Sequence, residues 1–195
     1  MKKVIWIINL LKIPFWELRY FFNKKIRMYV GVSSYKQYES FRLYPDYMKI
    51  GNAKTNVEKV ALSYCKGKGL DIGSSKWPLS NSRPIDFTEH ENAYIIKETD
   101  SCIDYIFASH LIEHLDDIER ALSEWKRVLK KNGILFLYVP HPACIMWNTD
   151  NNPYHYWNPS PLELVKILED NLFTVNEYSV LPDGYMSYYI VATNI

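Results

Sequence analysis

The chain has 195 residues, of which 48% are hydrophobic, which is enough for one well-packed domain but not for two. Its 23 basic and 22 acidic side chains give a formal net charge of +1, which excludes a global electrostatic attraction to nucleic acid. The three cysteines, Cys65, Cys102 and Cys144, are widely spaced. This spacing argues against a disulfide framework or a cysteine zinc site and predicts reduced thiols in a cytoplasmic protein.

The first 28 residues differ from the rest in charge. They hold seven basic side chains and one acid, Glu17, whereas the remaining 167 residues hold 16 basic and 21 acidic side chains. The apolar run Val4–Leu11 is short and no small-residue cleavage site follows it, so we expect neither a signal peptide nor a transmembrane helix. Two interpretations stay open. One is a helical arm packed on the domain, and the other is an amphipathic segment lying on an anionic membrane surface through Trp6, Trp16 and the lysines.

We therefore expect a helical N-terminal extension over residues 1–50 and a single domain over residues 51–195. Short apolar runs in the domain predict seven strands: "GKGLDIG", "SRPIDF", "NAYII", "IDYIFAS", "ILFLYVP", "FTVNEYSV" and "YMSYYIVAT". A helix is predicted from a cap at Asp116 or Asp117 through "KKNG", where Asn132-Gly133 can take a left-handed stop. A second helix is predicted over "SPLELVKILEDN" with Ser160 as its cap, and the turn "LPDG" joins the last two strands.

Strands that alternate with helices predict an α/β fold, in which a mostly parallel sheet has helices on both faces. The two consecutive strands at the end predict an antiparallel hairpin added to that sheet. Ligands of such sheets bind beyond the carboxyl ends of the strands. Asp71 and Gly73 end the first strand, and Asp86 ends the second. A glycine lets the backbone approach a ligand closely, and a carboxylate at the second strand can accept both hydroxyls of a ribose.

The stretch "GLDIGSSKWPLSNSRPIDF", followed by "DSCIDYIFASHLIEHLDDIERALSEWKRVLKKNGILFLYVPHP", resembles the S-adenosylmethionine-dependent methyltransferases of the type 11 family. The resemblance covers roughly residues 65–195 and is closest to compact members found among bacterial surface-polysaccharide biosynthesis proteins. Its most specific part is the run from "LIEHL" to "RVLKKNG". It implies the Rossmann-like class I methyltransferase fold, with a seven-stranded sheet whose last strand is antiparallel.

The resemblance also implies S-adenosylmethionine as the cofactor, with S-adenosylhomocysteine as the product. The residues that it places at the cofactor are Asp71, Gly73, Ser74, Ser75, Asp86, Phe87, Ile96, Ser109 and His110. Two departures from the family pattern matter. The usual G-x-G reads Gly73-Ser74-Ser75, and the stretch before "DSCID" lacks the common Asp-Leu-Pro, so Phe87 is expected to pack against the adenine ring instead.

A hydroxyl acceptor of the methyl group needs a base, because a hydroxyl is only weakly acidic. We expect His141, after the fifth strand, to be this base, with His155 as the second candidate. Glu113 and His114, inside "LIEHL", are interpreted as structural. No acidic cluster has the pattern of a magnesium site, so we expect a metal-independent enzyme.

The loop from Trp147 to Trp157 combines aromatic rings with amide and carboxyl groups, which suits a sugar ring. The function predicted from the resemblance is therefore O-methylation of a sugar or glycan precursor in the cytoplasm, with peripheral contact to the inner face of the plasma membrane through residues 1–28. Two alternatives stay open: a non-catalytic binding module with the methyltransferase fold, and a methyltransferase of a small metabolite or lipid. No nucleic-acid partner is expected, since the "N/D-P-P-Y/F" motif is absent.

Overall fold

The structure, a computed structural model, describes residues 52–144, 147–150 and 152–195. In this part of the chain the strands are β1 (Gly69–Ile72), β2 (Ser82–Ile85), β3 (Ile103–Ser109), β4 (Leu129–Pro140), β5 (Phe173–Tyr178) and β6 (Ser187–Asn194). The helices are α5 (Glu58–Tyr64), α6 (Ile118–Val128) and α7 (Pro161–Asp170), with short 3-10 turns η1 (Ala53–Asn56) and η2 (Ile112–His114).

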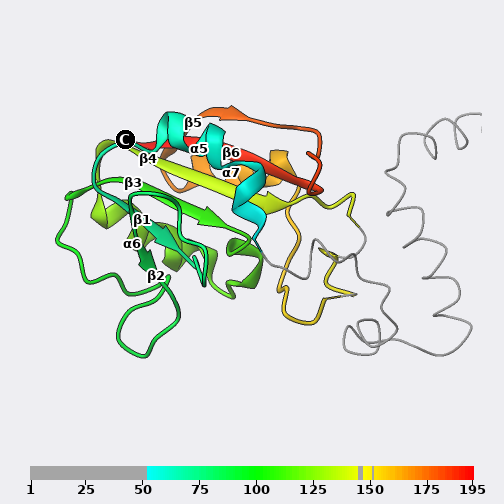
Figure 1. Cartoon of the computed structure of the whole chain (residues 1–195), viewed down its shortest axis with the longest axis horizontal. Coiled ribbons are helices and arrows are strands. Elements are labelled where there is room, and N and C mark those ends of the chain that lie inside the picture. The colour runs from blue at the N-terminus through cyan, green and yellow to red at the C-terminus, as the bar shows by residue number, and fades with distance from the viewer. Residues whose placement is uncertain (1–51, 145–146, 151) are drawn as a thin grey trace, which may run out of the picture.

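The described strands form one six-stranded sheet with the order β2-β1-β3-β4-β6-β5 (Figure 1). The strands β2, β1, β3 and β4 run parallel, whereas β6 pairs antiparallel with both β4 and β5. The prediction of a mixed, Rossmann-like α/β sheet with a reversed last strand is therefore confirmed. The reversal follows from the direct connection between β5 and β6, because only a crossover helix could have returned the chain to a parallel direction.

Two apolar layers hold the helices to the sheet. Alternate residues of each strand point to opposite faces, so β4 places Leu135 and Leu137 in one layer and Phe136 and Tyr138 in the other. The first layer also contains the buried residues of α6 and α7, and the second contains those of α5. As Figure 1 shows, α5 thus covers one face of the sheet, and α6 and α7 cover the opposite face.

The predicted helix starts agree with the structure. Ser160 caps α7 in a capping box, in which its hydroxyl accepts the Glu163 N–H and the Glu163 carboxylate accepts the Ser160 N–H. The Asp117 carboxylate caps α6 by accepting the Arg120 N–H. The end of α6 was predicted too late, since the helix stops at Val128 and "KKNG" belongs to β4. Asn132 does take the left-handed backbone conformation, with φ 62°, but within an irregular start of β4.

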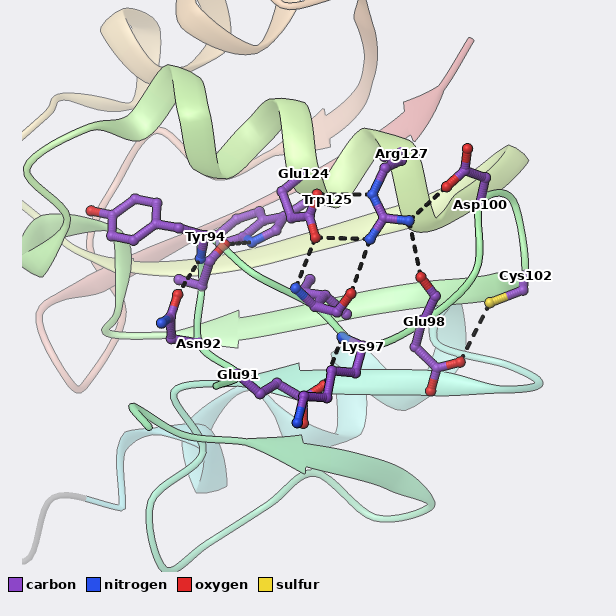
Figure 2. A network of polar contacts seen from close by, with 12 residues as sticks. Glu91, Asn92, Tyr94, Lys97, Glu98, Asp100, Cys102, Glu124, Trp125 and Arg127 are labelled. Carbon is purple, nitrogen blue, oxygen red and sulfur yellow. Dashed lines mark hydrogen bonds and ion pairs between the residues drawn. The ribbon is translucent and has the colours of Figure 1, made fainter. Parts of the chain in front are cut away.

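The predicted strand "NAYII" is absent, which accounts for six strands in the described residues where seven were expected. Only an isolated bridge between Asn92 and Ile95 forms. Side chains of α6 take the backbone groups that a strand would offer to its neighbours (Figure 2). Trp125 Nε1 donates to the Ala93 carbonyl at 2.9 Å, and Arg127 donates to the carbonyls of Ile96 and Glu98, each at 2.9 Å.

The helical extension predicted for residues 1–50 lies outside the described residues, and the domain boundary at residue 50 stays a prediction. Among the helices that the structure describes, none is long and apolar enough to cross a membrane.

Candidate active site

Two cavities lie at the carboxyl ends of β1, β2 and β3, and Gly73 lines both of them. The larger cavity has a volume of about 370 Å³ and is lined by Ile72, Gly73, Ile85, Asp86, Phe87, Asn92, Ala93, Tyr94, Leu111, His114, Leu115, Asp116 and Tyr156. The smaller cavity has a volume of about 180 Å³ and is lined by Asn52, Ala53, Lys54, Asp71, Gly73, Ser74, Ser75, Trp77, Phe107, Ser109 and His110. Because the two share Gly73, an elongated ligand can occupy both, with the loop after β1 between its two ends.

The loop after β1 keeps glycine-like backbone geometry although only its first glycine remains. Gly73 has φ 78°, and a Cβ there would lie 2.9 Å from Leu111 Cδ1, so a side chain is excluded by both conformation and space. Ser75 also has a positive φ, 50°, in the region that L-residues adopt at a cost. The Ser75 N–H donates to Asp86 Oδ1 at 2.8 Å. This bond ties the loop to the end of β2, so the loop is positioned in spite of the substitution.

Three residues that line the smaller cavity have a buried polar atom with no hydrogen-bond partner among the described residues: Asn52 Oδ1, Asp71 Oδ1 and Ser74 Oγ. The other carboxylate oxygen of Asp71 accepts the Leu79 N–H at 2.6 Å. Burial raises the pKa of Asp71 to about 7, since a charge is poorly solvated there. Unsatisfied buried polar atoms are costly. Their presence beside Gly73 therefore fits a ligand whose polar end supplies donors and acceptors, as the amino-acid end of S-adenosylmethionine would.

The larger cavity combines an acid with apolar walls. Asp86 lies at the end of β2, Ile72 and Ala93 contribute apolar surface, and Phe87 stands at the rim with 87% of its surface exposed. A carboxylate beside a flat apolar space suits a ribose attached to an adenine ring, and an exposed aromatic ring at the rim can stack on the base. Ile96 is not part of this wall. It is buried in the core, where its backbone N–H donates to Glu124 Oε1 at 2.8 Å.

His110 sits at the end of β3 in a strained backbone conformation, with φ 51°. Such strain in a non-glycine residue clusters at functional sites. Its Nε2 lies 2.8 Å from Ser187 Oγ, and burial lowers its pKa to about 3, so the ring is neutral at physiological pH. Of the nine residues predicted at the cofactor, the structure brings eight to the two cavities: Asp71, Gly73, Ser74, Ser75, Asp86, Phe87, Ser109 and His110.

The two predicted bases lie in different surroundings. His141 Nδ1 accepts the Ala143 N–H at 3.0 Å, and Nε2 lies 3.1 Å from the Val180 carbonyl. Both ring nitrogens therefore bond to the backbone, and His141 lines neither cavity. His155 is buried, and its Nδ1 lies 2.7 Å from the Trp147 carbonyl, an acceptor, so that Nδ1 is the donor and Nε2 keeps its lone pair. These contacts favour His155 over His141, and the assignment of a base stays a prediction.

His155 belongs to a group of side chains that the sequence analysis did not bring together. Glu113 is fully buried, its two carboxylate oxygens have no hydrogen-bond partner among the described residues, and burial raises its pKa to about 8. His110 Nδ1 lies 3.6 Å from Glu113 Oε1, and His114 Nε2 lies 3.9 Å from the same oxygen. The rings of His114 and His155 meet edge to face with their centroids 4.7 Å apart. We call Glu113, His110, His114 and His155 the Glu113 cluster.

Other cavity residues were also missed by the sequence analysis. They include Lys54, Leu111 and Tyr156. Leu111 and His114 stand in "LIEHL", directly after a predicted strand end, and that position was a usable signal. Lys54 precedes the sheet and Tyr156 stands in the long loop between β4 and α7, so nothing in their local sequence indicates that they meet the site.

Comparison with known proteins agrees with this geometry. Residues 54–137 match the family model described as a methyltransferase domain, a segment that runs from η1 into β4. No curated protein matches the chain. Many solved structures share the fold.

Three examples show the range of these structural matches. A SAM-dependent methyltransferase from Archaeoglobus fulgidus is 19% identical with a TM-score of 0.55, covering 76% of this chain and 100% of its own. One from Thermotoga maritima is 16% identical with a TM-score of 0.56, covering 77% and 95%. The geranyl diphosphate C-methyltransferase of Streptomyces coelicolor, solved with Mg²⁺, geranyl diphosphate and S-adenosylhomocysteine, is 11% identical with a TM-score of 0.53, covering 73% and 81%.

The structural likeness shows the fold, and the family model assigns the domain. Residues 54–137 match the methyltransferase domain model, and the chain is an enzyme that uses S-adenosylmethionine as its methyl donor.

Proposed function

We propose that the enzyme methylates a hydroxyl group of a saccharide or glycan precursor. The observation that carries this proposal is the pair of exposed tyrosines on the loop between β4 and α7. Tyr154 is 57% exposed and Tyr156 is 68% exposed, and Tyr156 lines the larger cavity. An exposed aromatic face next to a polar cavity can stack on the C–H face of a sugar ring while its hydroxyls hydrogen-bond nearby.

The backbone around Tyr156 is fixed to the site. Its N–H donates to the Glu113 carbonyl at 2.8 Å, and Trp157 Nε1 donates to the Ile112 carbonyl at 2.6 Å. Both acceptors belong to η2, which follows β3. The aromatic loop is therefore held over the carboxyl end of the sheet, and an acceptor stacked on Tyr156 would lie beside the cavity that Asp86 lines.

S-adenosylmethionine supplies a methyl group that is activated by a positively charged sulfur. The residues of the chain then have to hold donor and acceptor in line and close together, which supplies much of the rate acceleration. We assign Asp86 to the ribose hydroxyls, and Asp71 and Ser74 to the amino-acid end. Gly73 lets the backbone approach the ligand closely between them.

A hydroxyl acceptor must also lose its proton as the new bond forms. We place this step at the Glu113 cluster, because His114 lines the larger cavity and His110 lines the smaller one. His155 adjoins His114 with a free Nε2 lone pair. His141 is the weaker candidate because the backbone occupies both of its ring nitrogens.

The test is transfer of a labelled methyl group from S-adenosylmethionine to a panel of acceptors: nucleotide sugars, lipid-linked glycans, quinones and small hydroxylated metabolites. We expect transfer to a saccharide, and we expect Tyr156→Ala to raise the KM for that saccharide by tenfold or more while cofactor affinity stays unchanged. Tyr178→Ala, at an exposed tyrosine of β5, is the matched control. Transfer to quinones or small metabolites alone would contradict the saccharide proposal and favour the alternative acceptor classes.

A further inference from the structure

We propose that Glu113, His114 and His155 form a binding site for one divalent transition-metal ion of the Zn²⁺ or Co²⁺ type. The three side chains each offer a ligand atom, and these atoms all lie within 4.8 Å of one another. Two imidazoles and one carboxylate are a donor set that zinc and related ions take in catalytic sites.

The strongest observation is the state of Glu113. Its side chain is 0% exposed, and neither carboxylate oxygen has a hydrogen-bond partner among the described residues. A carboxyl group placed in this way costs several kcal/mol unless a partner or a metal ion compensates it. The two histidine nitrogens that face Oε1 are His110 Nδ1 at 3.6 Å and His114 Nε2 at 3.9 Å, too far for hydrogen bonds.

These separations fit ligands arranged around an ion. Ligand atoms about 2.1 Å from a tetrahedral centre lie about 3.4 Å from one another. The 3.9 Å between His114 Nε2 and Glu113 Oε1 therefore needs a contraction of about half an ångström. The third ligand atom, on His155, lies within 4.8 Å of the other two.

The two histidines are already oriented in the way that metal-bound histidines usually are. His114 Nδ1 lies 2.7 Å from the Tyr154 carbonyl, and His155 Nδ1 lies 2.7 Å from the Trp147 carbonyl. A carbonyl oxygen can only accept, so each Nδ1 donates and each Nε2 keeps its lone pair. Backbone carbonyls that fix the tautomer in this manner are typical outer partners of metal ligands.

An ion has a route into the cluster. The His114 side chain is 39% exposed and lines the larger cavity, so solvent reaches one of the three ligands. Three protein ligands leave a position open, as in catalytic zinc sites. An acceptor hydroxyl bound at that position would lose its proton to water more readily, so with an ion bound the cluster would promote this step through the metal and not through the His155 Nε2 lone pair. This role rests on the proposed function, whereas metal binding does not.

The test uses the full-length protein, stripped of metal with a chelator and titrated with Co²⁺, followed by its visible absorption and by calorimetry without any acceptor. We expect the wild-type protein to bind one Co²⁺ per chain. We expect the affinity for Co²⁺ to fall by tenfold or more in both Glu113→Gln and His155→Gln. His90→Gln, at an exposed histidine outside the cluster, removes the same kind of ligand and should leave affinity unchanged. Zn²⁺ should raise the melting temperature of the wild-type protein but not that of the two variants.

Binding that persists equally in Glu113→Gln and His155→Gln, or no binding of Co²⁺ and Zn²⁺ at all, would overturn the proposal. Preference for Mg²⁺ over Co²⁺ would also contradict it, because Mg²⁺ favours an all-oxygen site. Circular dichroism of both variants checks that they fold. The near-isosteric Glu113→Gln exchange preserves shape and removes an unpaired buried acid, so loss of binding in a folded variant reports the ligand itself. Since no methyl transfer is measured, this result is independent of the saccharide assay.

Discussion

Ser75 occupies a backbone conformation that glycine adopts at no steric cost. With φ 50°, the serine is strained by about 1–2 kcal/mol. A glycine at this position would relieve the strain, but part of the gain would be offset because glycine loses more conformational entropy on folding. We expect Ser75→Gly to raise the free energy of unfolding by about 0.5–1 kcal/mol, as measured by urea denaturation. Lys76→Gly, at the next position, where φ is not positive, should lower it. If both variants were destabilised alike, strain at Ser75 would be the wrong explanation.

Asp71 should make cofactor binding depend on pH. Its carboxyl has a pKa of about 7 in the folded protein, and the ionised form attracts the cationic amino-acid end of the cofactor better than the neutral form does. We therefore expect S-adenosylmethionine affinity to rise roughly five- to tenfold from pH 6 to pH 7.5. Titration calorimetry at both pH values checks this. Asp71→Asn should bind weakly with little dependence on pH, and a pH dependence that survived in this variant would come from another group.

The same pKa shift has a consequence for stability. Because the folded-state pKa of Asp71 lies above the ordinary value of 3.8, the folded protein holds the proton more tightly than the unfolded chain does. The stability that Asp71 contributes is therefore present at low pH and is lost as the pH rises toward 7.

The sequence predicted three single residues at strand ends, and the structure has them at the ends of β1 and β2 beside the two cavities. Asp71, Gly73 and Asp86 each follow an apolar run, and the carboxyl ends of parallel strands converge on one edge of the sheet. Ile96 was predicted at the cofactor from the stretch before "DSCID", where the family contacts adenine, but in the structure it lies in the core and lines neither cavity. The cluster around Glu113 was missed because His155 joins it from a loop some forty residues later in the chain.

At the scale of elements, periodicity predicted β3, α7 and the final antiparallel pair. It failed at "NAYII", where an apolar run is stabilised by long-range hydrogen bonds from α6 rather than by strand pairing. The local sequence gives no indication that Arg127 donates hydrogen bonds to the carbonyls of Ile96 and Glu98, which lie far from it in the chain. The late helix end has a similar cause, since "KKNG" carries helix-stop residues but its backbone enters β4.

Arg127 should accordingly matter for folding. Its planar group donates to two backbone carbonyls and to the carboxylates of Glu124 and Asp100 at once, and lysine cannot reproduce this fork. The side chain is 34% exposed, so solvent weakens these bonds, and we expect Arg127→Lys to cost about 2 kcal/mol of unfolding free energy.

Chemical denaturation measures this cost, with Arg120→Lys as the control on the same helix. Arg120 lies over the Tyr94 ring, 5.1 Å from its centroid, and its replacement should change stability by less than about 0.5 kcal/mol. A cost for Arg127→Lys as small as that expected for Arg120→Lys would show that the Arg127 network adds nothing to stability.

For the whole molecule, the charge division between residues 1–28 and the rest remains the basis of a membrane proposal. Seven basic side chains with two tryptophans are expected to favour an anionic surface. We predict that the full chain sediments with phosphatidylglycerol-containing vesicles at low salt, and that a chain lacking residues 1–28 does not. Equal sedimentation of both chains, or none with either, would leave the packed helical arm as the better interpretation.

The most direct test of the account as a whole is calorimetric titration of the protein with S-adenosylmethionine and S-adenosylhomocysteine. The account predicts micromolar binding that Asp86→Ala weakens by tenfold or more, about 1.4 kcal/mol. Asp170→Ala, at an exposed acid at the end of α7, should bind as the wild type does. No binding by the intact protein, or equal binding by Asp86→Ala, would show that the loop Gly73-Ser74-Ser75 and the end of β2 do not form the cofactor site.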